Sequence, residues 1–199
     1  MPASRLILVI AILVAICLPL SAETTTNANG WYMYFGDHRI KQSPFRLHLE
    51  GQWRRNDVAV VPQQAMFRPG INYTLNANVY LSLGYGFINT HRYGEFPVAQ
   101  PFPEHRFYQQ VAFKHSLGLI EILHRHRLEQ RLLGETLLAG GQLKVDRWRH
   151  ENRYRYQLRA NVPLQGRAID PGDWYLGLYN EVMMNFGKNV AANVFDQNR

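Results

Sequence analysis

The sequence predicts an all-β fold, an antiparallel transmembrane β-barrel of about 8–12 strands when complete, preceded by a cleaved signal peptide. Three observations predict it. Polar and apolar residues alternate in many segments, the N-terminus carries an apolar run of the length used for export, and the remainder contains no cysteine.

The first 22 residues have the parts of a secretory signal. Arg5 supplies a positive start, residues 6–20 form an apolar run, and Ser21 and Ala22 are small residues suited to a cleavage site. A retained anchor is the alternative, but roughly 15 apolar residues fall short of the ~20 that a spanning helix needs. We expect residues 1–22 to be a signal peptide and residues 23–199 to form one outer-membrane barrel domain.

Cysteine and charge narrow the classes of function. The single cysteine, Cys17, lies in the signal, so the mature protein has no thiol for disulfides, catalysis or metal ligation. Removal of Arg5 lowers the formal charge from +7 to +6, and most of the remaining basic residues are arginine. A basic protein can bind nucleic acid, but an exported one meets little of it, and we expect no nucleic-acid partner.

Strands are predicted along the whole remainder. In residues 147–162 the arginines share one parity and most of the aromatic and aliphatic side chains the other, which only an extended strand places on two opposite faces. No run of 18 apolar residues follows the signal, which excludes a helical membrane protein. The same alternation predicts strands at 45–54, 67–75, 79–87, 106–117, after 118, and at 174–186, with a short strand at 31–35.

A soluble β-sandwich is the alternative fold, because its strands also alternate. Sandwich strands are typically ~5–6 residues long. Several strands here reach ten residues or more, and Trp and Tyr concentrate toward their ends, as in the interfacial girdles of membrane barrels. The barrel is therefore favoured.

Several short motifs, in this order, resemble a known family. They are Trp31-Tyr-Met-Tyr-Phe, Phe67-Arg-Pro-Gly-Ile-Asn-Tyr73, Leu83-Gly-Tyr-Gly-Phe87, Glu104-His-Arg-Phe-Tyr-Gln-Gln110, His124-Arg-His-Arg-Leu-Glu-Gln-Arg131, Arg153-Tyr-Arg-Tyr156, Asn180-Glu181 and Phe195-Asp-Gln-Asn-Arg199. The chain resembles an uncharacterised outer-membrane β-barrel family of Gram-negative bacteria, classed only as a domain of unknown function, over residues 31–199.

This resemblance implies an outer-membrane location, with outer-membrane lipid, lipopolysaccharide and the barrel assembly machinery as partners. It implies no substrate, cofactor or catalytic residue. Members of such a family continue into further strands after the last motif, whereas this chain stops there, so we expect it to be incomplete at its C-terminus.

The candidate site is a charged ladder expected to face the lumen, because arginine on the lipid face costs ~2–4 kcal/mol at the membrane midplane. Its members are Glu50, Arg54, Arg68, Arg106, Arg125, Arg127, Glu129, Arg131, Arg147, Arg149, Glu151, Arg153, Arg155, Arg159 and Glu181. One interpretation is a structural network of cross-strand pairs. The other is a pore that attracts an anionic solute, since eleven arginines outnumber four glutamates in this set.

Other chemistry is weakly indicated. His124 and His126 share a face opposite the arginines, but two ligands are too few for a metal site. His115 and Ser116 are adjacent and point to opposite faces, which is wrong for a base and its nucleophile. We predict no catalytic residue, no cofactor and no metal. A narrow Arg-lined pore or structural barrel is the first hypothesis, a lipid-modifying or lipid-hydrolysing enzyme the second, and a periplasmic sandwich with an anionic partner the third.

The connections predict an orientation and a strand count. Long connections are expected at 90–103 and 133–144, on the outer side of the membrane, and short ones near Asn76 and Gly118. The Gly140-Gly141 pair is expected to make a turn. Seven strands are then long enough to span, the strand at 31–35 is too short and packs at the rim, and closure needs one more strand.

Two neighbouring substitutions test the predicted faces. Arg153→Glu should change ion selectivity or barrel stability, because this residue faces the lumen. Tyr154→Glu should instead impair membrane assembly, because it faces lipid. Equal assembly and equal conductance of the two refolded variants would show that the assignment of faces is wrong.

Overall fold

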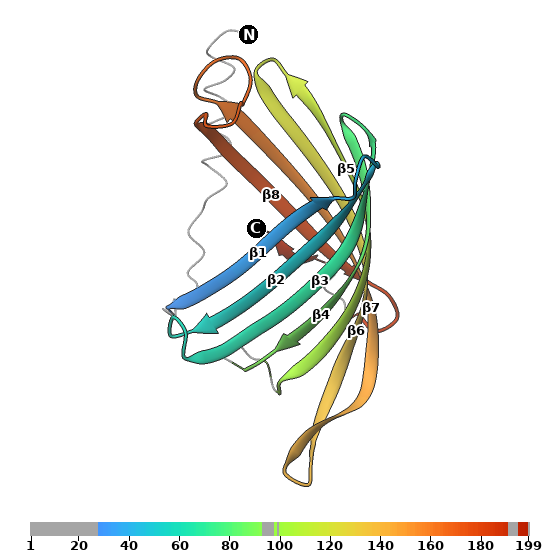
Figure 1. The fold of residues 1–199 in the computed structure, drawn as a ribbon. Coiled ribbons are helices and arrows are strands. Elements are labelled where there is room, and N and C mark those ends of the chain that lie inside the picture. Colours follow the sequence, from blue (N-terminus) through green and yellow to red (C-terminus); the bar gives the residue numbers. More distant parts are fainter. Residues whose placement is uncertain (1–27, 93–97, 99, 191–194, 199) are drawn as a thin grey trace.

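The chain forms one curled antiparallel sheet (Figure 1), and the space on its concave side is called the hollow below. The computed structural model describes residues 28–92, 98, 100–190 and 195–198, so the predicted signal peptide and Cys17 lie outside the described part. Nine strands follow one another in sequence order, and the described residues contain no helix. No helix that is long and apolar enough to cross a membrane is therefore present among these residues. The all-β antiparallel fold is confirmed.

Eight of the nine strands are long. Their bounds are β1 Asn29–Arg39, β2 Phe45–Asn56, β3 Val61–Asn76, β4 Val79–Thr90, β5 Phe102–Leu117, β6 Ile120–Ala139, β7 Gln142–Pro163, β8 Tyr175–Phe186 and β9 Phe195–Asn198. Each strand pairs with its neighbours in sequence, so the sheet is a simple meander. Among the described residues β1 pairs only with β2 and β9 only with β8, which leaves the sheet open and a closed barrel unobserved.

Tight turns join several of these strands. Residues 77–78, 118–119 and 140–141 each make a two-residue connection. Gly118, Gly140 and Gly141 have φ of 63°, 61° and 78°, and this left-handed conformation in a two-residue loop matches the right-handed twist of the strands. The short connections near Asn76 and Gly118 and the turn at Gly140-Gly141 are confirmed.

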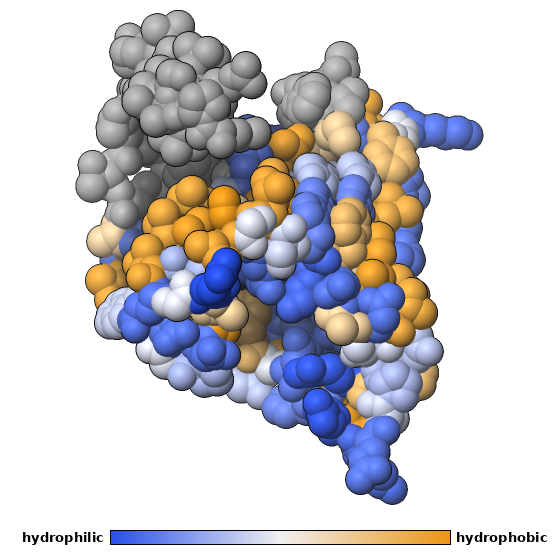
Figure 2. Space-filling view, turned by 90° about the horizontal axis from the view of Figure 1, so that it is seen from above, coloured by the Kyte–Doolittle hydropathy of each residue, from blue (hydrophilic) through white to orange (hydrophobic). Residues whose placement is uncertain are grey.

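The sheet is polar inside and apolar outside. Of the described residues, buried polar or charged side chains are three times as numerous as buried apolar ones. Large apolar side chains lie on the convex face instead, including Phe67 and Leu83, which are 55% and 63% exposed. Figure 2 shows hydrophilic residues gathered in the middle and hydrophobic ones along the outer wall. A sandwich needs a second sheet packed over an apolar face, so that alternative is wrong for the described residues.

The first strand is longer than the sequence indicates. β1 has eleven residues and pairs with β2 along its whole length, from Asn29 opposite Asn56 to Arg39 opposite Arg46. The prediction of a short rim strand at 31–35 is therefore wrong. The register turns Trp31, Met33 and Phe35 toward the hollow and Tyr32 and Tyr34 outward. Because both faces are apolar or aromatic, the strand has no alternation by which its length could be recognised.

The predicted long connection at 133–144 is also wrong. β6 continues to Ala139 and β7 begins at Gln142, so this segment is a hairpin that protrudes beyond the other strands (Figure 1). A register shift between Glu135 and Thr136 interrupts the alternation here, as a β-bulge does. The connection between β4 and β5, residues 91–101, is long as expected.

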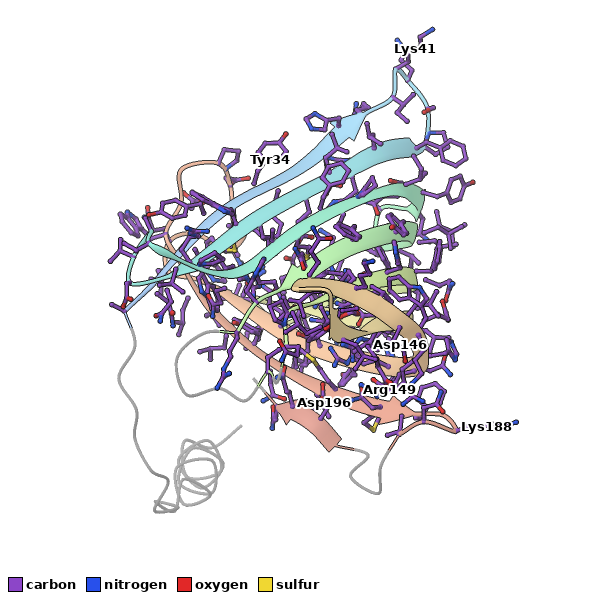
Figure 3. The ribbon with its side chains drawn as sticks, turned by 90° about the horizontal axis from the view of Figure 1, so that it is seen from below. Tyr34, Lys41, Asp146, Arg149, Lys188 and Asp196 are labelled. Atoms are coloured by element: carbon purple, nitrogen blue, oxygen red, sulfur yellow. The ribbon has the colours of Figure 1, made fainter. Side chains whose placement is uncertain are left out.

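The strand count differs for the same reasons. Eight strands of eleven or more residues are present instead of seven, and a ninth short strand, β9, pairs with β8 from Val182 to Met184. The predicted orientation, with the connections at 90–103 and 133–144 on the outer side, loses one of its two long connections, because residues 140–141 form a two-residue turn. Figure 3 shows the two edge strands, marked by Tyr34 on β1 and Asp196 on β9, on opposite sides of the hollow.

A single tyrosine fixes the packing of three strands in the hollow. Tyr108 on β5 is 2% exposed, and its ring lies against Gly84 on β4 and reaches Gly70 on β3. A Cβ atom on Gly84 would overlap the ring, and one on Gly70 would overlap the hydroxyl oxygen. Glycine in these two strands therefore makes room for the ring.

Gly84→Ala should lower the free energy of unfolding by about 1–3 kcal/mol, because the added methyl group forces Tyr108 from its place. The cost should nearly vanish in a Tyr108→Ala background, which denaturant unfolding of the four proteins would measure as a coupling. Gly51→Ala is the matched control, since a Cβ there meets nothing within 4 Å. An equal cost in both backgrounds would contradict the packing described.

Candidate functional site

The predicted charged ladder lies along the concave side of β2 to β8. The register aligns these side chains from strand to strand, with Arg68 opposite Glu50, Arg127 opposite Arg155, and Glu129 opposite Arg153. Arg147 and Arg149 lie farther out on the protruding hairpin, where their side chains are 74% and 37% exposed. The sequence therefore identifies a set of residues that the fold brings together, apart from these two.

The centre of the network is Glu129 on β6, which has no exposed surface. Its Oε1 lies 3.1 Å from Nη1 of Arg155 on β7 and 3.9 Å from Nη1 of Arg127. Its Oε2 lies 3.5 Å from Nη1 of Arg106 on β5. Three guanidinium groups from three strands thus surround one buried carboxylate, and they compensate for its lost hydration.

A second carboxylate connects β6, β7 and β8. Glu181 accepts hydrogen bonds from Nη2 of Arg125 at 2.7 Å and from Nε and Nη2 of Arg155 at 3.0 and 2.7 Å. The Arg155 contact is bidentate, which is the strongest geometry for such a pair. Arg155 therefore bridges Glu181 and Glu129.

Toward the β6–β7 turn a third group extends the network. Glu104 on β5 accepts hydrogen bonds from Arg106 and, at 2.7 and 3.0 Å, from Nε and Nη2 of Arg131. Nη1 of Arg131 also lies 3.4 Å from Glu151, which contacts Arg149. Arg147 and Arg149 both contact Glu135 at the base of the hairpin.

The other half of the hollow has its own pair. Glu50 on β2 is 1% exposed and accepts hydrogen bonds from Arg68 on β3 and from Gln52. The ring of His48 lies 3.6 Å from Glu50 and 3.0 Å from Asp37 on β1. Arg68 and its partners thus connect the first three strands.

Four of the predicted arginines donate hydrogen bonds to neutral side chains. Arg127 donates to the Gln110 amide oxygen at 2.9 and 2.6 Å, and Arg159 donates to Asn161 at 2.9 Å. Arg54 donates to Gln52 and lies 4.4 Å over the Trp31 ring. The remaining predicted residue, Arg153, donates to Asn185 and lies 2.7 Å from Asp196 on β9.

Sequence reasoning missed part of the acidic side of the network. Glu104, Glu135 and Asp196 contact the predicted arginines, which raises the carboxylates from four to seven against eleven arginines. Glu104 shares its parity with Arg106 and could have been found by that rule. Asp196 could not, because β9 is too short to show alternation.

Three cavities follow one another along the hollow. The first, about 350 Å³, shares Asp37, Asn72 and Tyr80 with the second, of about 160 Å³. The second shares Arg68 with the third, of about 280 Å³, whose lining comes from strands β2 to β9. Each cavity has at least one arginine in its lining. The cationic groups therefore border a series of three cavities that share lining residues.

Comparison with known families agrees with the sequence pattern. Residues 28–199 match the family described as "Protein of unknown function (DUF2490)". The chain belongs to this family. No curated protein and no solved structure matches it.

In this DUF2490 protein, His124 and His126 lie on the convex face of β6, beside His115 on β5. Nδ1 of His124 and of His126 are hydrogen-bonded to the hydroxyls of Tyr156 and Tyr154 at 2.8 and 2.6 Å. The His124 ring also stacks on His115 at a centroid distance of 5.2 Å. In the described part of the chain no group of three or more His, Cys, Asp or Glu residues is placed to hold a metal ion.

Glu129→Gln should lower the free energy of unfolding by about 3–5 kcal/mol, because three guanidinium groups lose the carboxylate that compensates them. Glu121→Gln on the same strand is the control. Glu121 pairs with Lys114 at the surface with 39% of its side chain exposed, so the loss should stay within about 1 kcal/mol. Similar midpoints for both variants in urea unfolding would contradict the central role of Glu129.

Proposed function

We propose that this DUF2490 protein is an integral outer-membrane β-barrel protein whose arginine-lined hollow is a narrow passage for anionic solutes. The observation that carries the proposal is that eight of the eleven predicted arginines line three neighbouring cavities along the hollow, beside three carboxylates, Asp37, Glu50 and Glu104. The proposal includes export through the predicted signal peptide, insertion by the barrel assembly machinery, and contact with outer-membrane lipid and lipopolysaccharide.

The sheet is apolar on its outer face and polar inside, which supports membrane insertion. Apolar side chains cover the convex face, and eight strands have the ~9–11 residues needed to cross a bilayer. Outward aromatic pairs lie near both ends of the first three strands, with Phe45 against Tyr73 at 5.0 Å and Tyr32 against Trp53 at 5.6 Å. Phe45 and Trp53 are separated by eight residues of β2, or about 26 Å of strand, which matches the ~25 Å apolar band of such barrels.

The interior charge supports the choice of solute. Rings of arginine favour anions, and a low-dielectric wall strengthens the field inside a narrow passage. Arg159 and Arg127 hydrogen-bond to neutral amides, so part of the positive charge is not neutralised by a carboxylate in direct hydrogen bonding. In lipid the free edge of β1 has to be paired, because unsatisfied backbone groups are excluded from hydrocarbon.

Planar-bilayer recording of the refolded full chain tests the proposal. Under a salt gradient the reversal potential should show anion preference, and Arg159→Glu should reduce it because it reverses a charge without orphaning a carboxylate. Lys144→Glu, the same change of charge on the protruding hairpin, should have a much smaller effect.

Two results would contradict the proposed passage. One is the absence of conductance from protein that has inserted into the bilayer, and the other is an equal effect of the two variants. Lipase activity of the same refolded material, without conductance, would favour the enzyme alternative.

A further inference from the structure

The middle cavity of the hollow has the properties of an anion site. It measures about 160 Å³, and its lining includes Tyr80 and Ser82 from β4 and Arg125 and Arg127 from β6. We propose that this cavity is a binding site for a phosphate-like oxyanion within the passage proposed above. The inference rests on that proposed function and specifies the class of its solute.

Arg127 supplies a buried positive charge without a close carboxylate. It is 7% exposed, its guanidinium donates hydrogen bonds to the neutral amide of Gln110, and its ion-pair contact with Glu129 is 3.9 Å long. The guanidinium carbon also lies 4.7 Å from the centroid of the Tyr108 ring. Since Glu129 is closer to Arg155 and Arg106, Arg127 is the member of that group least compensated by it.

Arg125 offers a donor that the protein leaves unused. Its Nη2 is bound by Glu181 at 2.7 Å, while its Nε is buried and has no hydrogen-bond partner among the described residues. A buried N–H of a charged group without an acceptor is unfavourable. Glu181 is also shared with Arg155, so Arg125 brings to the cavity lining a positive charge that this carboxylate compensates only in part.

Two hydroxyl groups complete the donor set. Because the Gln110 oxygen accepts from Arg127, its amide nitrogen faces Ser82 and donates to Oγ at 3.3 Å. The Ser82 hydroxyl hydrogen therefore stays available for a ligand. Tyr80, which carries the second hydroxyl, lines both this cavity and the first one.

The acidic residues of the same cavity are already bound. Asp37 accepts from Asn72 at 2.7 Å and lies 3.0 Å from His48, and Glu50 accepts from Arg68 and Gln52. Their charge is thus directed to groups on β2 and β3. The free donors come from β4 and β6, which favours an anion over a cation as the occupant.

A tetrahedral oxyanion fits these donors best. It carries several acceptor oxygens, and guanidinium groups bind phosphate in charge-assisted and often bidentate contacts. The cavity exceeds the ~30 Å³ share of one water several times over, so a phosphate group fits with accompanying water. The first cavity shares Tyr80 with this one and has Arg46 and Lys114 in its lining.

Calorimetric titration of the refolded full chain with inorganic phosphate, in phosphate-free detergent, tests the site. We expect one phosphate per chain, with affinity at least tenfold lower in Arg127→Gln and several-fold lower in Ser82→Ala. Arg159→Gln is the control, since it removes an equal charge outside this cavity and should leave the affinity unchanged. Ser82→Ala and Tyr80→Phe keep every arginine, so they test the site even where the loss of Arg127 impairs folding.

Further measurements distinguish a phosphate solute from a lipid headgroup, and the phosphate site from the passage. Glycerol phosphate should compete with inorganic phosphate, whereas a short-chain phosphatidic acid in mixed micelles should not, if the site serves solutes and not lipid headgroups. Phosphate should also reduce chloride conductance in bilayers. Conductance without phosphate binding would contradict the phosphate site but not the anion passage. Phosphate binding without conductance would contradict the passage but not the phosphate site. Equal phosphate affinity in the wild type, Arg127→Gln and Ser82→Ala would contradict the phosphate site.

Discussion

The pairing of buried charge inside the sheet is the constraint on which the rest of the structure depends. Glu129 has no exposed surface and contacts arginines from three strands. Because side chains alternate along a strand, a slip of one residue would turn each of these groups to the other face. The charged network therefore fixes the register of β5, β6 and β7, a task that an apolar core performs in most soluble proteins.

Two parts of the sheet present different chemistry to the hollow. β6 and β7 present mainly charged groups, while β1 presents Trp31, Met33 and Phe35. Trp31 combines the two, since its ring lies 4.4 Å from the Arg54 guanidinium and its Nε1 donates to Gln63 at 3.1 Å. Aromatic rings can hold cationic groups against their faces, so Trp31 extends the network without a carboxylate.

The sequence predicts the elements that obey alternation and misses those that depart from it. Residues 147–162 show their two faces directly, and β7 contains that whole segment. β1 and the end of β6 do not, because apolar residues occupy both parities in one and a bulge shifts the other. Parity also identifies which charges share a face. It cannot identify their partners, because the choice of Glu181 by Arg155, or of Gln110 by Arg127, depends on the register between strands.

Eleven predicted arginines face seven contacting carboxylates, so the network cannot consist of one-to-one pairs. Balanced pairs would satisfy one another and need nothing from solvent. Here Arg125 and Arg46 each have a buried Nε without a hydrogen-bond partner among the described residues. They line neighbouring cavities, Arg46 the first and Arg125 the second. Both unsatisfied donors thus belong to arginines that line the first two cavities, which share Asp37, Asn72 and Tyr80. One-to-one pairing of arginine with carboxylate therefore does not account for the whole of this interior.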